Sequence, residues 1–364
     1  FVAIRPEMTP TLARMVAQVH KQETKPIRWY AIPNLMRYEQ PQKGRLREHW
    51  QFNCDIFGAP GRMGELEILQ LAIVLMQNFG ATSEHFSILL NDREIVDTVF
   101  KRLLNLSDAQ TYALYKVVDK AKKVDSEALD KMAAEIVPDE ISRKIFHRYL
   151  GLTKFDDLFM FLQEHNISNY SESFKHLVDE IHALKLEKYI QYDPTIVRGL
   201  DYYTGVVFEI FDKHPDNRRA ICGGGSYANL LKIFNENPLP GVGFGLGDVT
   251  LTDFLKTHDL LPPNCEKPKA DVFLSFQIDT AATLALQLAT QLRQKGLNVV
   301  TNLEPIKFKK VFSAAEKRGA KFVFRIDQRE LENNEVQIKN MSNRNQDNMK
   351  LNDIDGIYHL IKQA

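Results

Sequence analysis

The chain has 364 residues, which suggests two or three domains, and its 44% hydrophobic and 26% charged residues are typical of a globular protein. Its 47 Lys and Arg balance 47 Asp and Glu, which gives a formal net charge of zero. This balance excludes a protein whose whole surface binds nucleic acid through positive charge, although a local basic site is compatible with it.

Residues 1–92 combine helical and extended patterns. Apolar residues recur at helical spacing over 9–22 and 64–79, which predicts two helices. Two runs rich in β-formers, 28–32 and 48–57, predict strands that pair with each other.

Residues 93–190 differ in character, because glycine is rare and apolar residues such as Leu103 and Leu106 follow helical spacing. We interpret this segment as an inserted helical domain without a catalytic role. Residues 191–258 return to glycine-rich β-sequence. They are expected to complete one split core with residues 1–92.

Residues 259–269 form a proline-rich linker, which is the clearest domain boundary in the sequence. From residue 270 to residue 364, strand and helix patterns alternate as β-α-β-α-β, which predicts a small domain with a parallel sheet. The elements of this pattern are 272–276, 280–295, 298–301, 307–317 and 322–326. A further strand over 335–339 and a closing helix over 352–362 are also predicted.

The segment 37–51 carries the densest group of charged residues that could act together. Its cations are Arg37, Lys43, Arg45 and Arg47. If the segment is a hairpin of two strands, alternation places Arg37 and Glu39 on one face. Arginine offers a rigid, bidentate donor that suits phosphate or carboxylate recognition. The alternative is a solvated hairpin whose charges form surface ion pairs.

Segment 37–55 resembles motif 2 of the class II aminoacyl-tRNA synthetases, in the form that this motif has in the histidyl-tRNA synthetase family. Segment 198–205, which reads Arg-Gly-Leu-Asp-Tyr-Tyr-Thr-Gly, is similar almost letter for letter to that family's histidine-specific motif. Segment 222–230, Cys-Gly-Gly-Gly-Ser-Tyr-Ala-Asn-Leu, resembles its second histidine motif, and 5–9 resembles the strand before motif 2. Residues 270–364 match its anticodon-binding domain, so the resemblance covers nearly the whole chain.

The resemblance implies an α+β catalytic core with an antiparallel sheet, a helical insertion and a C-terminal α/β anticodon-binding domain. It implies a histidine–tRNA ligase, which activates L-histidine with ATP and Mg²⁺, supplied as the substrate complex. The histidyl group then passes from the adenylate to the 3′ end of tRNA(His). A homodimer in the cytoplasm is expected, without membrane attachment and without a dedicated metal site.

The same resemblance assigns the catalytic and ATP-binding residues. Arg37 is expected to bridge the α-phosphate of ATP and the carboxylate of histidine, and Arg198 to stabilise that phosphate from the other side. An ion pair between Arg198 and Asp201 is the structural alternative. The expected ATP-binding residues are Arg37, Glu39, Arg45 and Arg47. The tRNA acceptor end is expected to contact Gln40 and Gln42, of which Gln40 replaces the more usual arginine.

Histidine recognition needs partners for both ring nitrogens and for the ammonium group. The resemblance places Glu7 beside the imidazole together with a tyrosine, and Thr9, Gln51 and Asp55 at the α-amino end. The remaining residues of the expected histidine site are Arg37, Arg198, Tyr202, Tyr203 and Tyr227. If Tyr202 and Tyr203 lie on a strand, one faces the ligand and the other packs in the core; packing alone is the alternative for the pair.

The sequence departs from the family pattern at several positions. Thr250 stands where motif 3 carries an arginine, which leaves open how the adenine end of ATP is held. In the second histidine motif, Ser226 and Ala228 replace an arginine and an aspartate. The chain begins at Phe1 without methionine, and we expect the dimer-forming motif 1 and the first core strands to precede it.

Two other function classes compete with the ligase. The first is a catalytically silent, histidine-sensing paralogue of the type found as a regulatory subunit of ATP phosphoribosyltransferase. That paralogue typically lacks the anticodon domain and loses motif residues, whereas this chain has Arg37, Arg45 and Arg198 and a C-terminal domain. The second is an RNA-binding α/β protein without ligase activity.

The cysteines Cys54, Cys222 and Cys265 lie far apart, which disfavours a zinc knuckle or a disulfide scaffold and fits a reducing cytoplasm. The longest uninterrupted apolar run, residues 71–76, is far shorter than the about 20 residues of a membrane helix.

Overall fold

A computed structural model describes residues 3–197, 202–262 and 269–363. Internal contacts divide the chain into two compact units, Phe1–Leu261 and Pro262–Ala364. Each unit has its own sheet and its own buried core, so each is described by itself.

The first unit is built on an eight-stranded sheet of the order β1-β3-β8-β7-β6-β4-β5, with β2 paired to β3. Neighbouring strands are antiparallel except for β4 and β5, which are parallel. The strands are β1 (Ile27–Ala31), β2 (Asn34–Met36), β3 (Glu48–Phe57), β4 (Phe86–Asp92), β5 (Ile190–Tyr192), β6 (Val206–Asp212), β7 (Cys222–Tyr227) and β8 (Gly241–Gly247). The predicted pairing of the first two β-runs is confirmed, since Ile27 lies opposite Phe57.

Helices cover both faces of this sheet and extend beyond one side of it. The longest, α2 (Met63–Asn78), packs on β3 and β8, while α1 (Thr9–Val19) packs with the short helix η3 (Leu230–Phe234) over the other face. The helix α9 (Asp248–Thr257) directly follows β8. Asp248 lies in its first turn, where a carboxylate suits the helix dipole.

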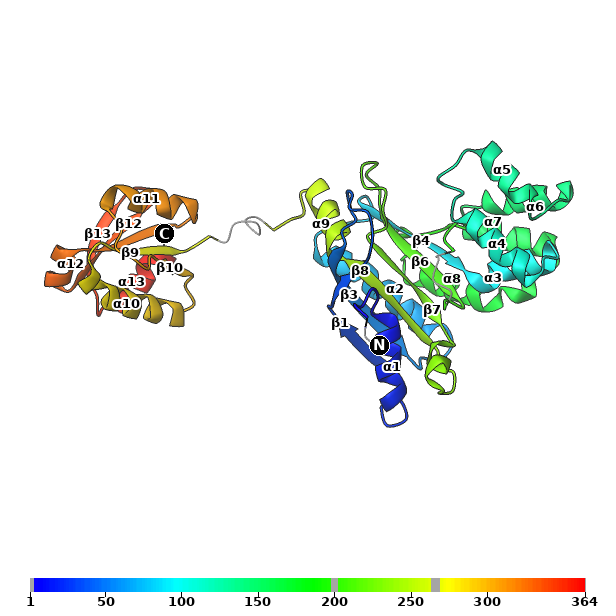
Figure 1. Cartoon of the computed structure of the whole chain (residues 1–364), viewed down its shortest axis with the longest axis horizontal. Helices are drawn as coiled ribbons and strands as arrows, with labels where there is room; N and C mark the ends of the chain where they lie inside the picture. Colours follow the sequence, from blue (N-terminus) through cyan, green and yellow to red (C-terminus); the bar gives the residue numbers. More distant parts are fainter. Residues whose placement is uncertain (1–2, 198–201, 263–268, 364) are drawn as a thin grey trace. The chain divides into compact units, whose positions relative to one another are not determined.

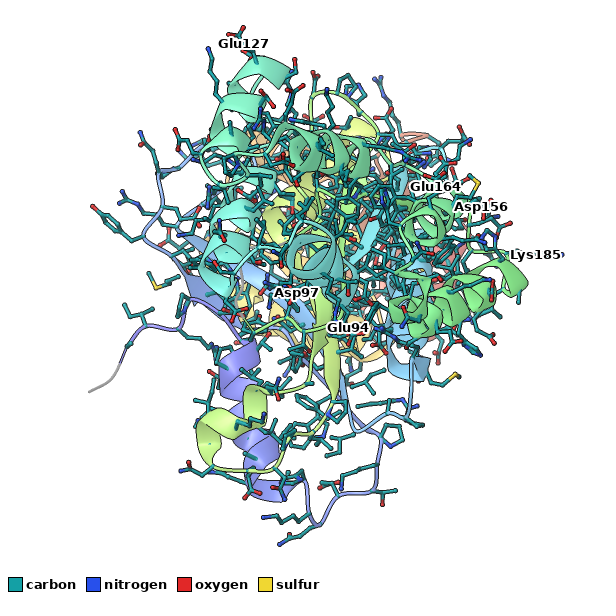
Figure 2. The ribbon with its side chains drawn as sticks, turned by 90° about the vertical axis from the view of Figure 1, so that its right-hand side faces the viewer. Glu94, Asp97, Glu127, Asp156, Glu164 and Lys185 are labelled. Carbon is teal, nitrogen blue, oxygen red and sulfur yellow. The ribbon has the colours of Figure 1, made fainter. Side chains whose placement is uncertain are left out.

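The insertion consists of short helices that lie together at one side of the sheet (Figure 1). They are α3 (Arg93–Asp97), the π-helical η1 (Thr98–Leu103), α4 (Asp108–Val118), α5 (Ser126–Ala134), α6 (Glu140–Leu150), α7 (Phe155–Glu164), η2 (Ser168–Tyr170) and α8 (Glu172–Ala183). Exposed charged side chains such as Glu127 and Lys185 extend away from this bundle (Figure 2). Its apolar side chains, in contrast, join the same buried cluster as those of the sheet and α2.

Strand β3 shows how the sequence separates core from site. Phe52, Cys54 and Ile56 pack toward the cluster around α2, as period-2 alternation requires. Gln51 and Asp55 alternate with them and therefore face the opposite side of the sheet. A polar surface on that side is thus a direct consequence of the β3 sequence.

The second unit has a five-stranded sheet of the order β10-β9-β11-β12-β13. Its strands are β9 (Val272–Phe276), β10 (Val299–Thr301), β11 (Phe322–Ile326), β12 (Glu335–Asn340) and β13 (Gln346–Lys350). The predicted β-α-β-α-β unit is present with parallel pairs β10–β9 and β11–β9. The prediction of a parallel sheet was incomplete, because β12 and β13 add antiparallel pairs and make the sheet mixed.

Helices cover both faces of the second sheet. Alternate residues of β9 and β11 pack against α10 (Ala282–Gln294) and α13 (Ile354–Lys362), and the others pack against α11 (Phe308–Lys317). Two short helices, η4 (Asp279–Ala281) and α12 (Gln328–Asn333), complete the unit. Within the described parts of both units, no helix has the length and apolar character that crossing a membrane requires.

Candidate active site

Two cavities adjoin on the polar face of the first sheet. We call the first, of about 490 Å³, the tyrosine cavity, because Tyr202 and Tyr203 line it. We call the second, of about 470 Å³, the arginine cavity, because Arg218 and Arg219 line it. Both are lined by Arg37, Glu39, Gln51, Asp119, Glu209, Gly223 and Gly245. The shared wall makes them two parts of one depression, with Arg37 at their junction.

The tyrosine cavity brings together residues that lie far apart in the sequence. The Tyr202 hydroxyl donates a hydrogen bond to a carboxylate oxygen of Glu7. The rings of Tyr202 and Tyr203 lie 4.8 Å apart between centroids. Six of the predicted histidine-site residues line this cavity: Glu7, Thr9, Arg37, Gln51, Tyr202 and Tyr203.

Tyr202 and Tyr203 do not lie on a strand, so the expected strand alternation is wrong. They occupy the irregular segment before β6, where Tyr203 is buried and Tyr202 is half-buried. Tyr203 fits there because Gly225 of β7 has no side chain, and a Cβ at that glycine would lie 2.7 Å from the Tyr203 ring. Both tyrosines nevertheless reach the cavity wall.

Asp55 and Tyr227 lie behind the wall of the tyrosine cavity and do not line it. Tyr227 is fully buried, and its hydroxyl donates a 2.5 Å hydrogen bond to Asp55 Oδ1. Burial raises the pKa of Asp55 to about 7, against the opposing effect of the Tyr227 hydrogen bond and with a smaller contribution from the negative charge of Glu7. Asp55 is therefore a carboxyl group whose charge is unfavourable without a cationic neighbour.

Two glycines of β8 provide the space for these polar side chains. A Cβ on Gly243 would lie 2.1 Å from Asp55 Oδ1, and a Cβ on Gly245 would lie 2.8 Å from the Gln51 amide. The contacts at Gly243 include the Cys54 backbone carbonyl at 2.6 Å, so close approach of β3 requires a glycine there, whereas at Gly245 the end of the Gln51 side chain would have to shift.

The arginine cavity is bordered by the loop between β2 and β3. The hairpin strand that would place Arg37 and Glu39 on one face is absent, because the segment between Met36 and Glu48 is irregular apart from an isolated bridge between Gln42 and Arg45. Gly44, in the turn between them, has a φ of 70°, a left-handed conformation that interrupts strand geometry.

Arg37 is held at the junction of the cavities by backbone contacts. Its Nε donates to the Pro6 carbonyl at 2.9 Å, and its N–H donates to the Arg47 carbonyl at 2.7 Å. No carboxylate lies within ion-pair distance of Arg37 in the parts of the chain that the structure describes. Burial and the charge of Arg37 lower the pKa of the neighbouring His49.

The other residues predicted from motif 2 divide into two groups. Glu39 and Arg45 line the arginine cavity and form an ion pair with each other. Arg47 does not line it; its Nε donates to the Glu39 carbonyl, and its guanidinium lies 5.2 Å from the Tyr38 ring centroid. Gln40 and Gln42 are exposed on the loop and line neither cavity. The predicted Arg198 and its alternative partner Asp201 lie outside the described residues.

The positions that depart from the family pattern have contacts of their own. Thr250 lines the arginine cavity, and its hydroxyl donates to the Ile221 carbonyl at 3.3 Å. Ser226 lines neither cavity and donates to Glu65 on the opposite face. In the residues that the structure covers, no group of His, Cys, Asp and Glu side chains is arranged to hold a metal ion.

Sequence reasoning missed several residues of the depression. Glu209 of β6 and Asp119, which follows α4 of the insertion, line both cavities. Arg218 and Arg219 line the arginine cavity from the turn between β6 and β7. The two arginines lie three and four residues before Cys222, the first residue of the second histidine motif, which is a signal that could have been used. Asp119 had no such signal, because the insertion was interpreted as structural.

Comparisons with known proteins agree with this geometry. The family model described as "Histidyl-tRNA synthetase" matches residues 1–249, and the model described as "Anticodon binding domain" matches residues 271–357. A histidine–tRNA ligase from Leptospira biflexa is 38% identical over 352 residues, which cover 95% of this chain and 78% of the relative. The chain belongs to the histidyl-tRNA synthetase family.

More distant members of the histidyl-tRNA synthetase family support the same assignment. The histidine–tRNA ligase of Thermoplasma volcanium is 32% identical over 354 residues, covering 97% of this chain and 81% of the relative. The solved histidyl-tRNA synthetase from Nostoc sp. PCC 7120 superposes with a TM-score of 0.79 at 23% identity, covering 99% of this chain and 83% of that one, which shows the shared fold. The fold class expected from the sequence is confirmed.

Proposed function

We propose that this chain is a histidine–tRNA ligase that forms histidyl-adenylate from L-histidine and ATP in the two adjoining cavities and transfers the histidyl group to tRNA(His). The observation that carries this proposal is the wall that the two cavities share. The tyrosine cavity is lined by polar side chains that suit an amino acid, the arginine cavity is rich in arginine, and Arg37 lies where the two cavities meet. Adenylate formation needs such a junction, because a carboxylate and an α-phosphate must react side by side.

Arg37 would relieve the repulsion between these two anions. A carboxylate oxygen of histidine attacks the α-phosphorus, the bond to the bridging oxygen of the β-phosphate breaks, and pyrophosphate leaves. The Pro6 carbonyl holds the guanidinium at its Nε, and the Arg47 carbonyl holds the backbone N–H of Arg37. A guanidinium positioned in this way would contact both reactants without reorganising during the reaction. Arg198 would act on the same phosphate from the other side, as the family motif implies.

Histidine would lie in the tyrosine cavity with its imidazole toward the pair formed by Glu7 and Tyr202. A buried acceptor for the ring N–H rejects amino acids without that donor, because its own hydrogen-bonding capacity would remain unsatisfied. Thr9 and Gln51 line the same cavity and would bind the α-amino end. The negative charge of Asp55, just behind the wall, would be stabilised by the ammonium group.

ATP would extend from Arg37 into the arginine cavity, where Arg45 contacts its phosphates beside Glu39. Magnesium would enter with ATP. The carboxylates of Glu39, Asp119 and Glu209 line this cavity, and carboxylate oxygens are ligands that Mg²⁺ accepts. They fit a metal shared with the phosphates better than a site made by protein alone.

The tRNA would contact both units. Gln40 and Gln42 are exposed beside the arginine cavity and are available to the acceptor end. The matched anticodon-binding domain would bind the anticodon. We further propose the division into a split core of 1–92 and 191–258, an insertion over 93–190, a linker over 259–269 and an anticodon domain over 270–364. A cytoplasmic homodimer is part of the same proposal and rests on the family resemblance.

The test is charging of tRNA(His) with labelled histidine, combined with single-turnover adenylate formation. Arg37→Ala and Arg198→Ala should each slow adenylate formation by about 10²–10³-fold, since each removes a donor to the developing charge. Arg28→Ala is the matched control, because Arg28 of β1 is exposed and forms an ion pair with Glu67 of α2. Wild-type rates in Arg37→Ala would refute the assigned role, and absence of charging by the wild-type chain would refute the function.

A further inference from the structure

Arg219 lies in the turn between β6 and β7 and lines the arginine cavity. Its Nε donates to the Lys43 carbonyl at 3.2 Å. Its Cδ lies so close to Gly44 that a Cβ on that glycine would be 2.9 Å away. Arg219 as a whole is half-buried, and the hydrogen bond of its Nε holds it against the β2–β3 loop. Its terminal nitrogens can still donate hydrogen bonds to a ligand.

No described carboxylate pairs with this guanidinium. The three acids that line the cavity are engaged elsewhere: Glu39 pairs with Arg45, Asp119 lies 3.0 Å from Lys123, and Glu209 has an interaction of its own. Asp216 and Asp253 line a smaller neighbouring cavity with Arg219, yet neither forms an ion pair with it within the described part of the chain. A half-buried arginine that is held at its Nε and has no carboxylate partner among the described residues favours an anionic ligand.

Thr250 leaves room for the guanidinium of Arg219, which reaches the arginine cavity from the β6–β7 turn. Thr250 is short and neutral, its hydroxyl is engaged by backbone carbonyls, and its Cγ2 lies 3.5 Å from the place where a Cβ on Gly44 would be. Thr250 and Arg219 therefore lie against the same point of the β2–β3 loop. An arginine at position 250 would compete with Arg219 for the same space.

The position of Arg219 in the depression selects the part of the ligand that it binds. Arg37 lines both cavities, whereas Arg219 lines the arginine cavity and not the tyrosine cavity. If the α-phosphate lies at the junction beside Arg37, the groups of ATP that lie beyond it are the β- and γ-phosphates and the adenosine. A guanidinium with free donors suits the phosphates.

We propose that Arg219 is a nucleotide-binding residue that holds the β- and γ-phosphates of ATP, in a chain where Thr250 leaves the first turn of α9 without a cation. This inference rests on the proposed function, because it takes the α-phosphate to lie at Arg37. It assigns to the β6–β7 turn a role in binding substrate.

The test compares Arg219→Ala with wild type in histidine-dependent ATP–pyrophosphate exchange and in direct titration with ATP, AMP and pyrophosphate. The KM for ATP should rise by about tenfold or more, the cost of a lost charged contact, while the KM for histidine stays within about threefold. Affinity for pyrophosphate should fall with that for ATP, and affinity for AMP should be unchanged. Arg14→Ala, an exposed arginine on α1, is the control.

A double variant tests whether Arg219→Ala still folds and whether a guanidinium at this place is what ATP binding needs. Adding Thr250→Arg to Arg219→Ala should lower the KM for ATP toward the wild-type value, because the new guanidinium enters the vacated space. An unchanged ATP affinity in Arg219→Ala, or an equal loss of affinity for AMP, would overturn the inference. Absence of exchange in the wild-type chain would instead contradict the proposed function, and the titrations would still decide the role of Arg219.

Discussion

At the scale of single residues, the site depends on polar groups whose burial is unfavourable until a ligand is present. Asp55 is almost completely buried against Tyr227, and burial raises its pKa to about 7. The Tyr202–Glu7 pair adds a half-buried carboxylate interaction nearby. Such groups reduce the stability of the unliganded protein, and we expect histidine binding to recover part of that stability.

Asp55→Asn tests this arrangement through the pH dependence of stability. Because the folded pKa of about 7 is above the usual value, the folded state holds the proton more tightly than the unfolded state. The stabilisation of the folded protein by the proton on Asp55 is complete in acid and is lost as pH rises through about 7. The free energy of unfolding of the wild type should therefore fall relative to Asp55→Asn by up to about 1.4 kcal/mol per pH unit between about pH 4 and 7.

Urea denaturation at several pH values measures this difference. Asp179→Asn, an exposed carboxylate on α8, should show no such trend. A difference between wild type and Asp55→Asn that is constant with pH would show that Asp55 is ionised in the folded protein throughout the range.

Gly243→Ala should abolish tight histidine binding, because the new methyl group would occupy the position of Asp55 Oδ1. We expect a loss of about 10²-fold in affinity, since an unpaired or displaced buried polar group costs a few kcal/mol. Gly247→Ala on the same strand is the control for histidine titrated without ATP, because its nearest contact would be an ordinary 3.6 Å. Equal behaviour of the two variants would contradict the close-approach argument.

Residue types and spacing predicted much of the site, but not its geometry. Arg37 and Arg45, to which motif 2 assigned ligand-binding roles, both line the arginine cavity, but their segment is not a strand, and Gly44 within it has a left-handed conformation. Arg219 was missed because a turn between two strands has no periodic signal. Its proximity to Gly44 arises only after β3, β8 and β7 have paired.

At the scale of elements, the insertion is continuous with the core of the sheet. Phe100 of η1 contacts the rings of Phe146 and Tyr149 of α6, and the hydroxyl of Tyr192 on β5 donates to that of Tyr149. Asp119, which belongs to the insertion, lines both cavities. The helices therefore help to position the site, which the sequence interpretation as a separate structural insertion did not include.

Phe146→Ala should destabilise the first unit as a whole. Phe146 is fully buried, so truncation leaves a cavity and should cost about 3–5 kcal/mol. Hydrogen exchange should show faster exchange in β4 and β5 as well as in α6, because all three share one buried cluster. Ile141→Ala, on the same helix but 70% exposed, should change little. Faster exchange confined to the insertion would show that it unfolds independently of the sheet.

Element prediction succeeded where burial gave a strong pattern. The predicted strands 272–276 and 322–326 agree with β9 and β11, whose residues are almost all buried. Strand β13 was missed because its sequence, Gln-Asp-Asn-Met-Lys, is polar and mostly exposed at a sheet edge. Hydrophobic periodicity cannot identify such a strand, since backbone pairing with β12 alone defines it.

At the scale of the whole molecule, zero net charge conceals a local concentration of cations. Arg37, Arg45, Arg218 and Arg219 converge on one cavity although they come from two distant segments. Composition excluded a uniformly basic surface, and the fold places the required charge at the junction of two cavities. Family membership and the matched anticodon-binding domain agree with a protein whose substrates are histidine, ATP and tRNA.

The most direct test of this account is ATP–pyrophosphate exchange by the full chain in the presence of each amino acid. We predict exchange that requires histidine, with other amino acids slower by about 10⁴-fold, because the half-buried pair of Glu7 and Tyr202 rejects side chains that cannot donate a hydrogen bond to it. Binding of histidine without any exchange at saturating ATP would contradict the account and would instead indicate a histidine-sensing paralogue.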